Sequence, residues 1–376
     1  MLFHDFEIAF CGYSGSGKTT LTEKVVRLLS ARFTIAYYKH GCHRFDIDRE
    51  GKDSWIVRHA GASTVMISDP EKDAVISAHT SASQRLEKLV FADADLLVVE
   101  GLKELPIPKL VVVDGERRIL DLVRNKNVIN VAALVVPDDP AMYEEFDIPV
   151  LHRDSVADIA AFIEFFLLHR SAQEHPVCGL VLAGGRSLRM GSDKALIEYH
   201  ADNQLIHTAK NLQRYCCNTY ISCRQEQTDA YQRFGFPLVA DTYLDIGPLG
   251  GLLSAQKARP EAAWIVLACD LPFLDASTLS QLFTRRNPLR FATAFRNPES
   301  GFLEPLCACY EPKSRSRLIL RHLEGNNSLL EFLDQSRIEE LVCSDGAALT
   351  NINDPEGRCG ALCKKKAGSS PAFESL

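Results

Sequence analysis

Apolar residues in the first half of the chain come in short, largely uninterrupted runs. Residues 6–11 form the first run, and residues 95–101, 109–115 and 131–137 form three more. Strands of a parallel sheet are buried on both faces, and they therefore read as continuous apolar runs. In residues 20–33 the apolar positions instead recur at helical spacing, which indicates an amphipathic helix. The pattern predicts an α/β domain built on a parallel sheet.

The end of this half is marked by a predicted helix and a polar join. Ser155 and Asp158 fit a capping box at the start of a helix that continues through residues 159–170,. The segment 171–176, SAQEHP, is short, polar and ends in proline, which is typical of a connection between domains. We therefore place the boundary within 171–176 and assign residues 1–172 to the first domain.

The same pattern begins again after the join. Strands are predicted at residues 177–183, 218–223 and 262–270, with helical segments between them,. Residues 177–358 are therefore predicted to form a second α/β domain. Residues 359–376 are lysine-rich and then small and polar, with too little apolar content to pack,. We expect a flexible tail there, with nucleic-acid or membrane contact as the less favoured alternative.

Composition narrows the class of protein and of partner. A chain of 376 residues exceeds what one hydrophobic core usually serves, which agrees with two domains,. With 46% hydrophobic and 24% charged residues, it is expected to be a soluble globular protein,. A formal net charge of −7 argues against nucleic acid as the main partner, because binding a polyanion needs a basic surface,. A small phosphorylated ligand is compatible with this charge.

The expected compartment is the cytoplasm. Residues 1–10 include two acids and no basic stretch, so they do not read as a secretory signal,. The longest apolar runs are too short to span a membrane. The twelve cysteines show no CxxC spacing, so they are expected to be reduced,. Buried packing is favoured over metal binding for the pairs Cys216–Cys217 and Cys307–Cys309.

A glycine-rich loop, GYSGSGKTT, lies between the first predicted strand and the first helix. It matches G-x-x-x-x-G-K-[ST], in which backbone N–H groups and a helix N-terminus hold a β-phosphate,. Lys18 is expected to reach the β- and γ-phosphates and Thr19 to bind Mg²⁺. A chance glycine-rich turn is the alternative, but the flanking strand and helix favour nucleotide binding. The predicted nucleotide-binding residues are Gly12, Gly15, Gly17, Lys18, Thr19 and Thr20.

Two further features belong near this loop. Glu100 ends a predicted strand where strand ends converge beside the loop, so it is the candidate metal-binding acid,. An exposed surface glutamate is the alternative. The segment 38–48 contains residue types that suit zinc, but without a second ligand cluster a switch or substrate loop is favoured. Its candidate residues are His40, Cys42, His43, Asp46 and Asp48.

The second domain opens with another glycine loop, LAGGRSLRMGSDKAL, of different spacing. Gly184 and Gly185 permit a tight turn where backbone amides approach a nucleotide, and Arg189 and Lys194 supply cations for a triphosphate,. This suits nucleotidyl transfer, in which an acceptor phosphate attacks the α-phosphorus and pyrophosphate leaves. Asp270 ends a predicted strand and is the candidate Mg²⁺ ligand, with helix capping as the alternative,. The predicted catalytic residues are Arg189, Lys194 and Asp270.

The motifs of the first half resemble the MobB family, small P-loop GTP-binding proteins that assist molybdenum cofactor maturation. The resemblance spans roughly residues 5–150, through GYSGSGKTTL, KHGCHRFDIDREGKDSWIVRHAGA and VVEGLKELPIPKL. The middle motif is more specific than the glycine loop alone. The resemblance implies GTP binding with weak hydrolysis and an adaptor role.

The second half, about residues 177–355, resembles the MobA family of molybdenum cofactor guanylyltransferases. LAGGRSLRMGSDK is its most specific motif, and VADTYLDIGPLGGL, ACDLPF and NINDPE follow in the family's order. The resemblance implies that Leu182, Ala183, Gly184 and Lys194 contact GTP, that Asp241 contributes to the nucleotide site and that Asp270 binds Mg²⁺.

Two segments depart from the family pattern. Where family members present an asparagine to the nucleotide, this chain has Ile221, which bears on the base preference. The segment GFLEPLCACYEP lacks the histidine of some members, and its Glu304 is a candidate for acceptor binding or for a structural role at a strand edge.

The sequence therefore predicts a P-loop NTPase-like domain fused to a Rossmann-like nucleotidyltransferase domain. The expected reaction transfers GMP from GTP to Mo-molybdopterin, with Mg²⁺ as cofactor and pyrophosphate as product. The expected partners are molybdenum cofactor biosynthesis proteins and apo-molybdoenzymes, without nucleic acid or membrane. A cytidylyltransferase using CTP and a non-catalytic, nucleotide-gated cofactor carrier are the alternatives.

Overall fold

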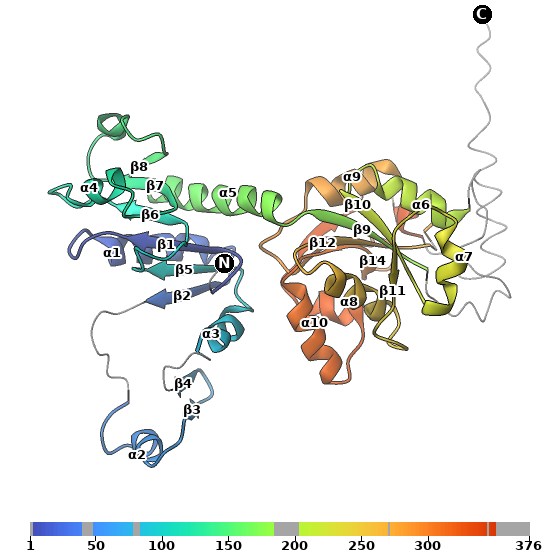
Figure 1. Ribbon diagram of the computed structural model, residues 1–376, viewed down its shortest axis with the longest axis horizontal. Coiled ribbons are helices and arrows are strands. Elements are labelled where there is room, and N and C mark those ends of the chain that lie inside the picture. Colours follow the sequence, from blue (N-terminus) through green and yellow to red (C-terminus); the bar gives the residue numbers. More distant parts are fainter. Residues whose placement is uncertain are drawn as a thin grey trace, which may run out of the picture. The chain divides into compact units, whose positions relative to one another are not determined.

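The computed structural model describes residues 3–39, 48–77, 83–183, 203–269, 271–343 and 346–350. The chain divides into two compact units, Met1–Leu167 and Leu168–Leu376 (Figure 1). The division falls inside the helix α5, Val156–Glu174. Residues 171–174 of the expected polar join are thus the last turn of a helix, whereas the predicted start of this helix just after Ser155 agrees with the structure.

The first unit is built on a six-stranded sheet in which every strand pair is parallel, in the order β2-β5-β1-β6-β7-β8. The central strands β1, β5 and β6 are completely buried, which explains their continuous apolar runs,. The strands are β1 (Glu7–Cys11), β2 (Ile35–Lys39), β5 (Leu96–Glu100), β6 (Lys109–Val112), β7 (Val131–Val136) and β8 (Val150–His152).

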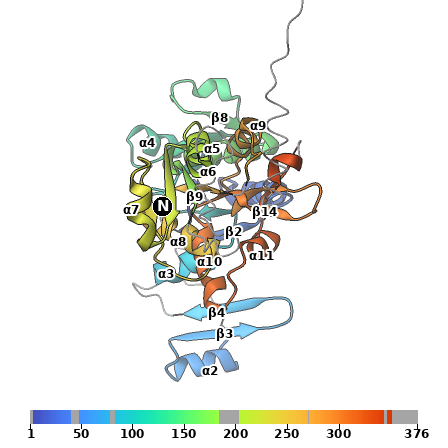
Figure 2. The same cartoon turned by 90° about the vertical axis from the view of Figure 1, so that its right-hand side faces the viewer.

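Helices of the first unit connect these strands, and one hairpin stands apart from them. The helices are α1 (Lys18–Leu29), α2 (Asp53–His59), α3 (Ser83–Phe91), α4 (Ile119–Arg124) and α5, with the 3-10 turn η1 (Pro140–Tyr143). Strands β3 (Thr64–Ser68) and β4 (Asp73–Ser77) pair antiparallel in a two-stranded sheet of their own (Figure 2). Neither strand was expected from the sequence.

The second unit contains a mixed seven-stranded sheet in the order β11-β10-β9-β12-β14-β13-β15. Its first four strands are parallel, so their carboxyl ends meet at one edge, whereas β14 runs antiparallel to β12 and β13. The strands are β9 (Val177–Leu182), β10 (Asn218–Cys223), β11 (Leu238–Ala240), β12 (Ala263–Ala268), β13 (Ala292–Arg296), β14 (Leu303–Tyr310) and β15 (Glu339–Val342).

Helices cover both faces of this sheet. Helices α6 and α9 pack on one face, and α8, α10 and α11 pack on the other (Figure 1). The helices are α6 (Gln204–Leu212), α7 (Thr228–Gln232), α8 (Pro248–Ala258), α9 (Ala276–Thr284), α10 (Ser314–Leu323) and α11 (Leu329–Asp334), with the 3-10 turns η3 (Gln225–Gln227) and η4 (Gly346–Leu349). The α/β fold predicted for both halves is confirmed.

The cysteines and the helices bear on two further predictions. Cys216, Cys307 and Cys309 are buried as predicted, but Cys217 is exposed because it lies just before β10. Among the residues that the structure describes, no helix combines the length and the apolar character needed to cross a membrane.

Candidate functional site

The first glycine loop connects β1 to α1, as its motif requires. A Cβ atom at Gly12 would lie 2.6 Å from the carbonyl oxygen of Val112, so only glycine fits there. Gly17 precedes α1 with a left-handed φ of 84°, and Gly15 has a φ of 79°. Because Gly17 has no side chain to cap the helix, the first N–H groups of α1 stay available to a bound anion.

The first turn of α1 carries the polar residues of the motif. It begins with Lys18, Thr19 and Thr20. Lys18 Nζ donates a hydrogen bond of 2.7 Å to the carbonyl oxygen of Tyr13, at the start of the loop. Burial lowers the pKa of Lys18; the negative charge of Glu100 opposes this effect, and the positive charge of Lys103 adds to it.

Glu100 lies beside this turn, at the carboxyl end of β5. Its side chain accepts hydrogen bonds from Thr19 Oγ1 at 3.0 Å and Tyr37 Oη at 2.9 Å, and it pairs with Lys39 Nζ at 3.1 Å. Burial would raise the pKa of Glu100, but these three donors lower it below its ordinary value,. The residue is only 6% exposed, so the surface-glutamate alternative is wrong.

Thr19 and Glu100 together offer a hydroxyl and an ionised carboxylate, which are the hard oxygen ligands that Mg²⁺ prefers. The residue types at this position therefore fit a magnesium ion. The described residues of the segment 38–48 give no support to a zinc site. Asp48 is committed to Ser54 and Arg58, with oxygen distances of 2.8 Å to each. His40, Cys42, His43 and Asp46 lie outside the described residues.

Two cations near the loop were missed by the sequence analysis. Lys103 Nζ lies 4.2 Å from the centroid of the Tyr13 ring. Arg153 Nη1 donates a hydrogen bond of 3.3 Å to the carbonyl oxygen of Ser16. Each follows the carboxyl end of a parallel strand, β5 or β8, where ligand-binding residues of such sheets are found,. This position could have identified Lys103 from the sequence. It could not have identified Arg153, because β8 has only three residues and was not predicted.

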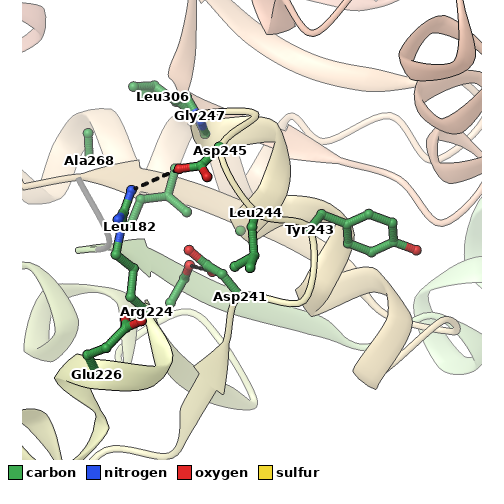
Figure 3. Close-up of a pocket in the computed structure, with 13 residues that line it drawn as sticks. Leu182, Arg224, Glu226, Asp241, Tyr243, Leu244, Asp245, Gly247, Ala268 and Leu306 are labelled. Atoms are coloured by element: carbon green, nitrogen blue, oxygen red, sulfur yellow. Dashed lines mark hydrogen bonds and ion pairs between the residues drawn. The ribbon is translucent and has the colours of Figure 1, made fainter. Parts of the chain in front are cut away.

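The second unit has a cavity of about 500 Å³ at the carboxyl ends of its parallel strands. It is lined by residues of β9, β10, β12 and β14, by Asp241 just after β11, and by the loop leading into α8 (Figure 3). The principal lining residues are Leu182, Ser222, Arg224, Glu226, Asp241, Tyr243, Leu244, Asp245, Gly247, Pro248, Gly251, Ala268 and Leu306.

Two glycines of α8 bring this helix close to the sheet. A Cβ atom at Gly250 would lie 2.3 Å from the carbonyl oxygen of Tyr243. One at Gly251 would lie 2.5 Å from Ser222 Oγ and 2.7 Å from Leu182 Cδ2. A larger residue at position 250 would meet the loop before α8, and one at 251 would meet the side chains of β9 and β10, so the glycine pair lets α8 lie close to both.

Polar residues of the cavity come from the ends of β10 and β11. Ser222 Oγ donates a hydrogen bond of 2.7 Å to Asp241 Oδ1. Burial raises the pKa of Asp241, and the hydrogen bond from Ser222 and the charge of Arg224 oppose the rise. Arg224 Nη2 lies 3.6 Å from Asp245 Oδ1, an ion pair drawn as a dashed line in Figure 3.

Ile221 does not line this cavity. It is completely buried in the core on the opposite face of β10. Because side chains alternate along a strand, the next residue, Ser222, faces the cavity instead,. The side chain of β10 that lines the cavity is thus that of Ser222, which was not among the predicted site residues.

The structure brings together only part of the predicted second site. Leu182 and Asp241 line the cavity, and Ala183 N bonds to the carbonyl oxygen of Ser222 at 3.0 Å. Glu304 lines a separate hollow of about 420 Å³, where it accepts a hydrogen bond of 2.9 Å from Asn297 Nδ2. Outside the described residues lie Gly184, Gly185, Arg189, Lys194 and Asp270.

Comparison with known families finds two matches along the chain. Residues 7–136 match the family described as molybdopterin guanine dinucleotide synthesis protein B. Residues 179–340 match the family described as MobA-like NTP transferase domain.

Similar proteins support the same division. A molybdopterin-guanine dinucleotide biosynthesis adapter protein of Haemophilus influenzae is 33% identical over 43% of this chain and 89% of its own length. A molybdenum cofactor guanylyltransferase of Pseudomonas putida is 31% identical over 48% of this chain and 95% of its own length. A molybdenum cofactor biosynthesis bifunctional protein of Synechocystis is 30% identical over 48% of this chain, and the match spans only 52% of that relative.

Proposed function

Because the chain belongs to the MobB family in residues 7–136 and to the MobA-like NTP transferases in residues 179–340, we propose that it is a molybdenum cofactor guanylyltransferase fused to its GTP-binding adaptor. The second unit transfers GMP from GTP to the terminal phosphate of Mo-molybdopterin and releases pyrophosphate. The first unit binds GTP and serves the delivery of the cofactor to apo-molybdoenzymes and the contact with other cofactor biosynthesis proteins. In this proposal the adaptor domain comprises residues 1–172, the transferase domain comprises residues 177–358, and residues 359–376 form a tail.

The observation that carries the transferase function is the cavity at the edge of the sheet in the second unit. Ligands of open α/β sheets bind outside the carboxyl ends of the parallel strands. Three residues that line the cavity lead to parts of the proposed site. Leu182 lies two residues before Gly184 of the second glycine loop, Asp241 contributes a carboxylate, and Ala268 lies two residues before Asp270. The elements that lead to the three proposed parts of the site therefore end at one cavity.

In this proposal Lys194 and Arg189 neutralise the triphosphate, and the amides of Gly184 and Gly185 approach it. Asp270 would hold a magnesium ion, which would neutralise negative charge on the pyrophosphate leaving group. Nucleotidyl transfer needs positioned groups and charge neutralisation more than a covalent nucleophile. The arrangement of two glycines, two cations and a carboxylate serves that chemistry.

In the first unit, the contacts of the glycine loop support nucleotide binding. Lys18 reaches back to Tyr13, and the Thr19 hydroxyl lies 3.0 Å from Glu100. We assign Thr19 and Glu100 to a magnesium ion there, and Gly12, Gly15, Gly17 and Thr20 to the phosphates. Weak GTP hydrolysis is compatible with this set of residues.

The proposal is tested by competition between nucleotides. The purified chain is incubated with Mg²⁺, Mo-molybdopterin and either GTP or CTP, and the dinucleotide product and pyrophosphate are quantified. Guanine dinucleotide formed from GTP in clear excess over cytosine dinucleotide supports a guanylyltransferase. Equal or greater use of CTP points to a cytidylyltransferase on the same fold, and no product from either nucleotide favours a non-catalytic carrier.

A further inference from the structure

The loop that follows β5 is held in an unusual backbone conformation. Leu102 has a φ of 54° and Gly101 a φ of 103°. A positive φ is costly for leucine and persists only where the surrounding structure enforces it, most often at functional sites. Gly101 N donates a hydrogen bond of 3.0 Å to the carbonyl oxygen of Phe10, the partner of Glu100 in β1. The next residue, Lys103, is therefore presented from a fixed backbone beside the phosphate loop.

The far end of this loop is fixed as well. The side chain of Lys109 is completely buried, and its ammonium group donates to three backbone carbonyls instead of to a carboxylate. Two of these carbonyls, those of Leu105 and Ile107, belong to the loop, and the third belongs to Ile129. The loop that carries Lys103 is thus anchored on both sides, which lowers the entropy that a ligand contact from Lys103 would cost.

Lys103 and Lys18 converge on one residue of the phosphate loop. The ammonium group of Lys103 lies 4.2 Å from the ring centroid of Tyr13, and that of Lys18 lies 2.7 Å from the carbonyl oxygen of Tyr13. The P-loop lysine reaches the β- and γ-phosphates of a bound nucleotide. Two ammonium groups, those of Lys18 and Lys103, therefore lie beside the same residue of the phosphate loop.

Two other cations near the loop, Lys39 and Arg118, are paired with carboxylates, and Arg153 donates to the carbonyl oxygen of Ser16. Lys39 pairs with Glu100 at 3.1 Å, and Arg118 pairs with Asp114 at 3.4 Å and with Glu116 at 3.1 Å. Within the described ranges, Lys103 forms no ion pair with a carboxylate; its contact is the aromatic ring. Its charge also lowers the pKa of Lys18, which reflects repulsion between the two ammonium groups. An anion between them would relieve this repulsion.

We propose that Lys103 contacts the γ-phosphate of the nucleotide in the first unit and makes that site select nucleoside triphosphates over diphosphates. The proposal rests on nucleotide binding at the first glycine loop. Lys103 is a binding residue in this role, since it adds a cation that only the terminal phosphate meets. It gives the adaptor a means of distinguishing GTP from GDP.

The test is the affinity of the full-length chain for a non-hydrolysable GTP analogue and for GDP, both with Mg²⁺. Binding to the first unit is taken as the part that a Lys18→Ala chain lacks, because the second unit also binds GTP. Losing one charge-assisted hydrogen bond should raise the Kd for the triphosphate at least about tenfold in Lys103→Ala. The Kd for GDP should change less than about threefold, since the diphosphate lacks the group that Lys103 binds.

Two variants serve as controls. Lys103→Arg should stay within about threefold of the original chain for both nucleotides, because arginine also binds phosphate. Lys24→Ala removes an exposed lysine of α1 and should change neither affinity.

The outcomes separate the inference from the function on which it rests. An equal loss of GTP and GDP affinity in Lys103→Ala would show that Lys103 only supports Tyr13 and the loop, and it would overturn the proposal. Unchanged triphosphate affinity in Lys103→Ala would overturn it as well. If the original chain and Lys18→Ala bind both nucleotides identically, nucleotide binding by the first unit is itself refuted.

Discussion

The hydrogen bond between Ser222 and Asp241 joins the ends of two neighbouring parallel strands at the proposed nucleotide site. Burial raises the pKa of Asp241. An acid with a higher pKa in the folded than in the unfolded chain holds its proton more tightly when folded, so its ionisation costs stability as the pH rises. Asp241 is therefore retained at a cost in stability, which is typical of residues that serve a ligand.

Replacing this carboxylate should separate stability from function. We expect Asp241→Asn to raise the free energy of unfolding of the second unit at pH 7, with the difference narrowing as the pH is lowered towards the ordinary pKa of aspartate, 3.8. GTP affinity of the second unit should fall by roughly tenfold, the effect of losing one charge-assisted hydrogen bond. Urea unfolding followed by the fluorescence of buried Trp264, in a Trp55→Phe background, measures the first effect. A variant that is less stable at pH 7 would contradict the account.

Glu100 shows the opposite behaviour, because three donors hold its carboxylate ionised beside Thr19. If it binds Mg²⁺, Glu100→Gln should weaken GTP binding by the first unit about tenfold or more when Mg²⁺ is present, since an amide is a poorer ligand than a carboxylate. In EDTA the variant and the original chain should bind alike. Calorimetric titrations in the two buffers make the comparison, and an equal loss in both would assign Glu100 a purely structural role.

At the scale of elements, the close contact between α8 and the parallel strands shapes the second cavity. Gly251→Ala places a methyl group against Ser222 and Leu182, at distances so short that these side chains or α8 must shift. Overpacking of this kind costs about 1–3 kcal/mol of folding stability. The variant should also raise the KM for GTP, because the cavity wall moves.

The matched control is Gly115→Ala, at a position where an added Cβ meets no atom within 4 Å. Its effect on stability should remain within about 0.5 kcal/mol, as for most surface substitutions. Denaturant unfolding of both variants, together with transfer kinetics, provides the test. A Gly251→Ala chain with unchanged KM and stability would show that α8 does not set the shape of the site.

The sequence predicted elements where one local signal was sufficient. The apolar runs correctly predicted seven strands, because strands that are covered on both faces consist almost entirely of apolar residues. These strands are β1, β5, β6, β7, β9, β10 and β12. The β3–β4 hairpin was not predicted because its residues are mostly exposed and its apolar runs, 65–67 and 74–76, are only three residues long. The polar segment 171–174 is helical because α5 continues through it, and polarity alone does not end a helix,.

Site residues were predictable where a motif fixes their spacing and less so where the fold brings distant segments together. Lys18 and Thr19 belong to one local motif, and their partner Glu100 was predicted because strand ends share an edge. Lys103 and Ser222 depend on how a loop turns and on which face of a strand is covered. These are tertiary facts that a local pattern does not contain.

At the scale of the whole molecule, the two proposed nucleotide sites lie in two separate units of one chain. The first has the geometry of a P-loop, and the second is a cavity at the edge of a different sheet. Joining an adaptor to the transferase that it serves raises the effective concentration of each beside the other, to about the millimolar range for a short connection. In the proposed function the fusion would thus favour transfer of product without changing the chemistry of either site.

In the proposed function the chemistry belongs to the second unit, and the first unit is an adaptor. The measurement that tests it most directly is the rate of guanine dinucleotide formation by the full-length chain carrying either Lys18→Ala or Asp270→Asn, with Mo-molybdopterin, GTP and Mg²⁺ supplied. We predict that Lys18→Ala retains most of the rate, whereas Asp270→Asn loses at least about a hundredfold, as expected for removal of a catalytic electrostatic group. Loss of transfer in Lys18→Ala, or a near-normal rate in Asp270→Asn, would contradict this account.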